Sequence, residues 1–142
     1  MKRAPLFLSG LVLLGIGIAI LFAPHAFHAM HDITLPADPS LLSEVRAPGG
    51  ALIAIGALVL LGAFRPQHTR ASAALGAATY LAYGASRGVS LLLDRVPHEG
   101  LIQAMGVEFP LGVGCLVVAA RSGGMTHRAT SSGGVPSAWP SA

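Results

Sequence analysis

Polar side chains that could bind a ligand or hold a reacting group recur on one stripe of an otherwise apolar segment, residues 71–93. At about 100° per residue of an α-helix, one face carries Tyr80, Tyr83, Arg87, Ser90 and Asp94. A guanidinium, two phenols, a hydroxyl and a carboxylate together supply donors and acceptors of hydrogen bonds. Because ionisable groups within apolar spans avoid lipid, we expect this stripe to face other helices.

Further charged residues lie at a similar depth in neighbouring segments. Arg87 and Glu108 are each about two helical turns, roughly 10 Å, from the same end of their segments. Glu44 and Arg46 lie near the corresponding end of another segment. Two arginines and two glutamates would therefore share one layer, in the outer half of the membrane, with cancelling formal charges. Since an unpaired charge at mid-membrane costs about 2.5–3.5 kcal/mol, we expect pairing. Arg87 with Glu108 is the favoured pair, because a short turn joins their segments.

Two interpretations of this charge layer are open. In one, the charges only clamp the helices together. In the other, they line a pocket for a ligand or a reacting group. The pocket is favoured, because ionisable residues inside membranes commonly mark functional sites and the stripe is longer than one clamp requires.

The segments that carry these residues predict a small integral membrane protein. Of 142 residues, 53% are hydrophobic and 11% charged, against about 25% charged in an average soluble domain. Four apolar runs, at about residues 6–23, 41–64, 71–93 and 101–120, can each cross the hydrocarbon core, which takes about 20 residues. The prediction is an all-α four-helix bundle over residues 1–120, antiparallel and up-down. Residues 121–142, rich in Ser, Gly, Thr and Pro, predict a disordered tail.

The first run has a second interpretation, a cleaved signal peptide, because basic residues precede it. An uncleaved span is favoured, since the apolar part of a signal peptide is usually roughly 7–15 residues long. The run from residue 6 to residue 23 exceeds that length.

Loop charges predict the orientation. One set of loops and ends is positive, with Lys2, Arg3, Arg65, Arg70, Arg121 and Arg128. The opposite loops hold a single arginine, Arg95, and all the loop acids: Asp32, Asp38, Asp94 and Glu99. Because positive loops stay in the cytoplasm, both termini are expected there, in a multi-pass protein of the plasma (inner) membrane. The net charge of +3 then reflects topology, and we expect no nucleic-acid partner.

Histidines and the lone cysteine have plainer interpretations. His25, His28 and His31 are spaced by three, and His98 lies in another loop. Imidazoles can bind zinc or copper, but the loop holds prolines and no four-ligand pattern, so we expect solvated or interfacial histidines and no metal. A pH-responsive role is an alternative. Cys115 is expected to pack as a small apolar residue.

Glycines and one proline bear on helix geometry. Pro48 predicts either a helix that begins near it or a kink. No nucleotide or phosphate loop is recognisable, so no cofactor is expected. Close contacts between helices are expected at Gly10, Gly17, Gly49, Gly56, Gly62, Gly76, Gly84, Gly106, Gly112 and Gly114.

The order of these polar residues resembles a known family. The motifs are Glu44-x-Arg46-x-x-Gly49-Gly50, then Arg87-x-x-Ser90 with Asp94 and Pro97, then Glu108. Over about residues 5–120 they are similar to the bacterial four-span membrane proteins called the domain of unknown function 4345 family. This resemblance implies an integral membrane protein with four helices. It implies no established activity, substrate or cofactor.

Three functional classes are compatible with these features. The favoured one is a non-enzymatic accessory or scaffold subunit, because four helices with short loops leave little room for a catalytic domain. The alternative is a membrane-embedded binder or carrier of a small anionic or amphipathic molecule. A membrane-embedded enzyme using the same Arg, Glu and Tyr groups is the third. The expected partners are accordingly the lipid bilayer, a membrane protein or a second copy, and a small-molecule ligand.

Overall fold

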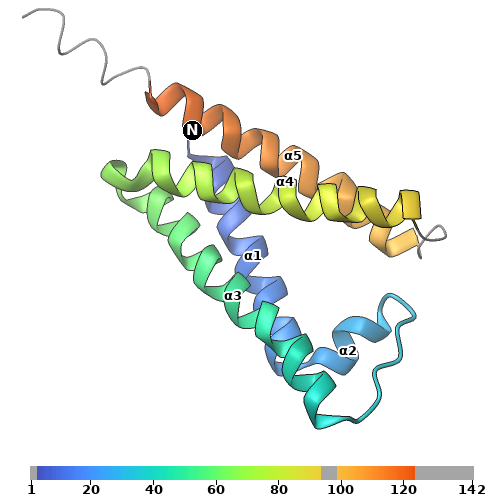
Figure 1. Cartoon of the computed structure of the whole chain (residues 1–142). Helices are drawn as coiled ribbons and strands as arrows, with labels where there is room; N and C mark the ends of the chain where they lie inside the picture. Colours follow the sequence, from blue (N-terminus) through green and yellow to red (C-terminus); the bar gives the residue numbers. More distant parts are fainter. Residues whose placement is uncertain (1–2, 94–98, 124–142) are drawn as a thin grey trace, which may run out of the picture.

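The computed structural model describes residues 3–93 and 99–123, in which every regular element is a helix (Figure 1). The elements are α1 (Ala4–Phe22), α2 (Pro24–Ala29), α3 (Pro39–Phe64), the 3-10 helix η1 (Pro66–His68), α4 (Thr69–Leu93) and α5 (Glu99–Gly123). The predicted all-α class is confirmed. The four long helices cover the four apolar runs, and the short α2 lies between the first two runs.

The helix ends follow local capping. α3 begins at Pro39, because the Asp38 side chain accepts a hydrogen bond from the Leu41 N–H at 2.8 Å. The helix then continues through Pro48, so a start near Pro48 is wrong. Pro48 has no backbone N–H, so the carbonyl of Glu44 lacks its usual donor within the helix. Glu44 is exposed, so this part of α3 is not buried inside the protein. α5 continues to Gly123, and the remainder of the predicted tail, 124–142, lies outside the described residues.

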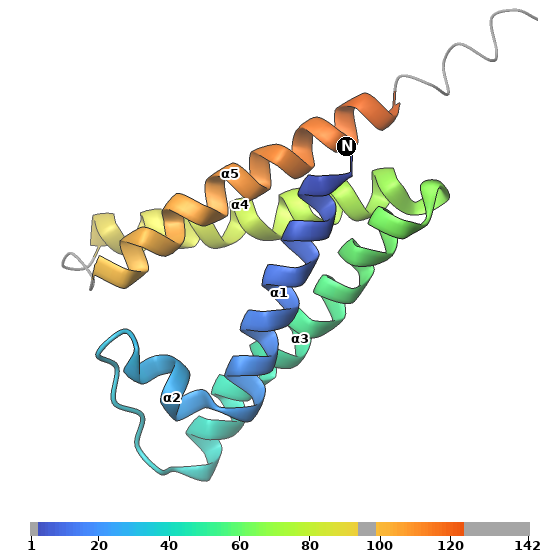
Figure 2. The same cartoon turned by 180° about the vertical axis from the view of Figure 1, so that it is seen from behind.

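The four long helices form two antiparallel pairs, α1 with α3 and α4 with α5. The pairs meet where α1 and α4 begin and α3 and α5 end, and they splay apart toward their other ends (Figures 1 and 2). α2 lies in the mouth between them. A regular antiparallel four-helix bundle is therefore not confirmed, since the α4–α5 pair crosses the first pair instead of packing along it.

Glycines let α1 and α3 approach closely. A Cβ added at Gly17 would lie 2.8 Å from the Gly49 carbonyl oxygen, and one added at Gly56 would lie 2.8 Å from the Leu14 nitrogen. Side chains there would push the two backbones apart. The predicted role of glycine is confirmed at these positions and is wrong at Gly106, where an added Cβ would meet nothing within 4 Å.

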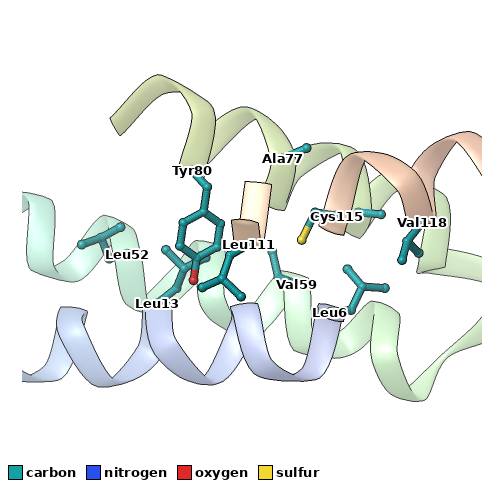
Figure 3. Packing of buried hydrophobic residues seen from close by; sticks show 10 residues of the cluster. Leu6, Leu13, Leu52, Val59, Ala77, Tyr80, Leu111, Cys115 and Val118 are labelled. Carbon is teal, nitrogen blue, oxygen red and sulfur yellow. The ribbon is translucent and has the colours of Figure 1, made fainter. Parts of the chain in front are cut away.

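Where the pairs meet, all four long helices contribute to one apolar core (Figure 3). Its buried members are Leu6, Leu13, Leu52, Val59, Ala73, Ala77, Tyr80, Leu111, Cys115 and Val118. Two hydroxyls join α3 to α4 beside this core: Thr69 Oγ1 donates to the Gly62 carbonyl at 2.9 Å, and Ser72 Oγ donates to the Leu58 carbonyl at 2.6 Å. Because each hydroxyl is satisfied inside the protein, this corner tolerates an apolar environment.

Many large apolar side chains of the long helices are exposed, which indicates a membrane protein. Three segments are long and apolar enough to cross a membrane: α1, α3 and Ile102–Ser122 of α5. Over an 18-residue stretch of each segment, no more than 28% is buried inside the protein, so the remaining apolar surface is suited to lipid. The predicted third span, α4, is not in this set, because Arg87, two tyrosines and small polar residues lower its hydropathy.

Candidate functional site

A cavity of about 270 Å³ lies in the wedge between the two helix pairs. This volume approaches the lower end of ligand pockets, about 300–1,000 Å³. The cavity is lined by Val12, Leu13, Ile16, Ile20, Phe27, His31, Leu52, Tyr80, Tyr83, Arg87, Ala104, Val107 and Glu108. The α1–α3 side of this lining is entirely aliphatic. The polar and charged side chains come from α4, α5 and the segment that follows α2.

Arg87 on α4 and Glu108 on α5 form an ion pair in the cavity wall. Arg87 Nε donates to Glu108 Oε1 at 3.0 Å, as the sequence predicts for two antiparallel neighbours. The two side chains are 29% and 12% exposed, respectively. The pair is therefore largely shielded from solvent, and its attraction is stronger than that of a fully exposed pair.

Two buried polar atoms in the lining have no hydrogen-bond partner among residues 3–93 and 99–123: Glu108 Oε2 and His31 Nδ1. An unsatisfied buried polar atom typically costs about 1–3 kcal/mol. Both residues line the same cavity. A polar group bound there could form hydrogen bonds with these two atoms. An ion pair that only holds the helices together does not explain why they are left without partners.

Tyr80 fixes α4 to α1 beneath the cavity. Its hydroxyl donates to the Ser9 carbonyl at 2.7 Å, and the Cys115 thiol donates to the Ser9 hydroxyl at 3.2 Å. All three residues are buried. Figure 3 shows the Tyr80 hydroxyl directed toward α1. Tyr80 therefore contributes its ring to the cavity and commits its hydroxyl to the contact between the helix pairs.

The rest of the predicted polar stripe divides into three. Tyr83 lines the cavity and is 39% exposed, so its side chain is accessible to a bound molecule. Ser90 is exposed and does not line the cavity. Asp94 lies outside the described residues.

The predicted layer of four paired charges is not formed among the residues that the structure describes. Glu44 and Arg46 are both exposed in the first turns of α3 and form no ion pair with Arg87 or Glu108. The reason is the splay of the two helix pairs, because the first turns of α3 lie at the open end of the wedge (Figure 1). Of the four charges, the structure brings together Arg87 and Glu108.

The three histidines near α2 have different environments. His25 is exposed. His28 Nδ1 donates to the Pro24 carbonyl at 2.8 Å within α2. His31 reaches the cavity, and its ring packs edge-on against Phe27 at 5.7 Å. In the described ranges no group of three His, Cys, Asp or Glu side chains could hold a metal ion, and His98 lies outside them.

Sequence reasoning missed two contributions to the site. Ser9 joins Tyr80 and Cys115, and the available signal was its position as the sole hydroxyl residue in the first apolar run. Phe27 and His31 close one side of the cavity, because the turn after α1 folds α2 back into the wedge. Nothing in the local pattern of residues 24–38 indicates the direction of that turn.

The arrangement combines an aliphatic wall with a compact polar patch. Glu108 Oε2 can accept a hydrogen bond, and Arg87 retains N–H donors beyond the one bound by Glu108 Oε1. The tyrosine rings of α4 add amphipathic surface. Such a site suits a molecule that has an apolar body and a small polar end.

A model of the family described as Domain of unknown function (DUF4345) matches residues 1–119. The matched region includes every residue of the cavity lining. Neither the curated proteins nor the solved structures contain a match to the chain.

Proposed function

The chain belongs to the DUF4345 family, and we propose that it is a four-span membrane protein that binds a small amphipathic molecule between its two helix pairs. The family's description assigns no activity. Support for this function comes from the cavity and its unsatisfied polar atoms.

The position of α4 beside α5 supports a fourth span. Each helix has 25 residues, and they pack as antiparallel neighbours. If α5 crosses the membrane, α4 reaches a similar depth. Two of the polar groups that lower the hydropathy of α4 are bonded inside the protein, Tyr80 to the Ser9 carbonyl and Arg87 to Glu108. Polar groups satisfied in this way are tolerated within a membrane.

The charge distribution supports an inner-membrane topology with both termini in the cytoplasm. The exposed residues Arg65, Arg70 and Arg121 lie at the end of α3, the start of α4 and the last turn of α5. Figure 1 shows that the helix pairs meet at these helix ends. Asp32 and Asp38 lie in the loop at the open end. Under the positive-inside rule the meeting end is cytoplasmic, and the mouth of the wedge faces the outer side.

One observation carries the binding proposal: a buried carboxylate oxygen, Glu108 Oε2, has no described partner in a cavity whose opposite wall is aliphatic. A helix clamp would be more stable with both carboxylate oxygens satisfied and the neighbouring space filled by side chains. A bound molecule would supply both the missing hydrogen bond and the missing apolar contacts.

The accessory or scaffold role is a second candidate, favoured by a different observation. Glu44 and Arg46 are exposed charges at the open end of α3, where a membrane-protein partner or a second copy could pair with them. An embedded enzyme would use the groups that we assign to binding, and no separate observation favours it.

Native mass spectrometry of the full chain, purified from native membranes in mild detergent, tests the binding function. We expect one small-molecule adduct on the wild-type protein. Ile16→Trp fills the cavity and should reduce the adduct by about tenfold or more. Ile18→Trp is the matched control, since Ile18 is exposed on the same helix and does not line the cavity. A stoichiometric protein partner on a wild-type chain without any adduct would favour the scaffold instead.

A further inference from the structure

The polar patch of the cavity carries no net formal charge. Arg87 and Glu108 lie in direct contact, 3.0 Å apart, and their formal charges cancel. No other lining residue has a permanent charge; His31 is the remaining titratable side chain besides the tyrosines. A ligand with a charged end would therefore bring an uncompensated charge into a largely apolar cavity, where such a charge is strongly disfavoured.

This patch offers a ligand two kinds of hydrogen-bonding group, an acceptor on Glu108 and donors on Arg87. Glu108 Oε2 needs a donor. Arg87 uses Nε for Glu108, and its terminal N–H groups, on a side chain that is 29% exposed, can donate to an acceptor. A hydroxyl group supplies both, because one oxygen donates one hydrogen bond and accepts others. A carboxylate supplies acceptors only, and an ammonium supplies donors only.

We infer that the occupant is a neutral long-chain alcohol, a conclusion that rests on the proposed binding function. Its hydroxyl donates to Glu108 Oε2 and accepts from the Arg87 guanidinium. Its hydrocarbon part lies against the aliphatic wall of α1, which Leu13 and Ile16 help to form. His31 Nδ1 offers a further polar contact for an alcohol that has a second oxygen.

The size of the cavity limits how much of the chain it encloses. An apolar cavity of about 150 Å³ can hold one benzene molecule, so a volume of 270 Å³ holds roughly eleven heavy atoms. A longer chain has to leave the cavity between the splayed helix pairs and enter the lipid. Glycerides with a free hydroxyl and isoprenoid alcohols share this chemistry, and competition experiments can distinguish them.

The test uses photoreactive probes with the full chain in lipid nanodiscs. Three diazirine probes share one alkyl chain and end in a hydroxyl, a carboxylate or an ammonium group. Labelling is titrated, and the labelled positions are mapped by mass spectrometry. In the wild type we expect the alcohol to label the cavity lining with an affinity about tenfold or more above that of either charged probe.

Changing the net charge of the Arg87–Glu108 patch should change which of the three probes binds most tightly. Glu108→Gln leaves the Arg87 guanidinium without its counter-ion, so the carboxylate probe should become the best ligand. Glu99→Gln removes an exposed carboxylate from the same helix and should leave the order of the three probes unchanged. A role of Glu108 in stability alone would not reverse this order. Circular dichroism and size-exclusion profiles verify that both variants are folded.

Unlabelled competitors identify the source of the alcohol. A monoacylglycerol and an isoprenoid alcohol are each titrated against the alcohol probe, and displacement by either supports the inference, with the stronger competitor indicating the class. Failure of both to displace the probe overturns it. A wild type that prefers the carboxylate or the ammonium probe, or a Glu108→Gln variant with unchanged preference, also overturns the neutral-alcohol inference while leaving amphiphile binding intact. If no probe labels the cavity, the proposed binding function is overturned as well.

Discussion

Arg87 Nε and Glu108 Oε1 lie 3.0 Å apart between α4 and α5, while the other oxygen of the same carboxylate has no partner among the described residues. The pair therefore joins two helices and still leaves a strong acceptor in the cavity wall. Stabilisation of the fold and recognition of a ligand can reside in the same two side chains. Measurements of stability and of binding separate these contributions.

A double-mutant cycle tests whether Arg87 and Glu108 are energetic partners. Arg87→Met and Glu108→Leu should each destabilise the protein by roughly 1–3 kcal/mol, below the value for fully buried pairs because Arg87 retains 29% exposure. The double variant should recover much of this loss, since neither charge then remains unpaired. Thermal unfolding in detergent measures the cycle. Additive losses, with no recovery in the double variant, would show that the two residues do not interact.

The Tyr80 hydroxyl should matter for stability more than the Tyr83 hydroxyl. Tyr80→Phe removes the hydrogen bond to the Ser9 carbonyl and should cost about 0.5–1.5 kcal/mol. Tyr83→Phe is the control on the next turn of α4, where the side chain is 39% exposed, and should have little effect. Both are compared by thermal unfolding in the same detergent. Equal effects would indicate that the contact between Tyr80 and α1 does not hold the helix pairs together.

Two glycines on α1 should respond oppositely to alanine. A Cβ at Gly17 would lie 2.8 Å from the Gly49 carbonyl oxygen. Gly17→Ala should therefore push α1 away from α3 and destabilise the protein by about 1–3 kcal/mol. A Cβ added at Gly15 would meet nothing within 4 Å. Gly15→Ala should therefore leave stability unchanged or raise it by up to about 1 kcal/mol, because alanine has the higher helix propensity. Chemical denaturation in mixed micelles compares the two. A tolerated Gly17→Ala would argue against the close packing of this pair.

Reporter fusions test the topology. A reporter joined after Gly123 should be active in the cytoplasm, and a tag inserted beside Asp38 should react with an impermeant reagent from outside. Junctions at Gln67, in the turn between α3 and α4, provide a second cytoplasmic position. A carboxyl-terminal reporter active only outside would mean that α4 does not cross the membrane, leaving three spans.

The sequence predicted the extent of the helices better than their arrangement. Long apolar runs that end at a proline such as Pro24 or at a charged residue such as Arg65 predict helices, because backbone N–H and C=O groups in lipid must form hydrogen bonds with each other. They say little about crossing angles, since lipid-facing and protein-facing sides are equally apolar. Here the arrangement depends on the close approach at Gly17 and Gly49 and on the corner where Ser72 bonds the Leu58 carbonyl.

The site was predictable where partners lie on sequential antiparallel helices. Arg87 and Glu108 could be paired from their depths and from the five residues that separate α4 from α5 in the sequence, because consecutive antiparallel helices with so short a connection are neighbours. Glu44 has a similar depth but lies across the open end of the wedge, and depth alone does not reveal lateral separation. The contribution of His31 depends on how α2 folds back after α1, which is a tertiary property.

Ligand occupancy of the folded Arg87→Met/Glu108→Leu variant separates a binding site from a simple clamp most directly. The variant keeps the apolar volume of the wall and removes both the charges and the unsatisfied acceptor. It is purified beside the wild type, its folding is verified by its thermal transition, and the bound small molecule is quantified by native mass spectrometry. We predict a folded protein whose occupancy falls by about tenfold or more. A folded double variant with the same occupancy as the wild type would contradict a binding role for Arg87 and Glu108.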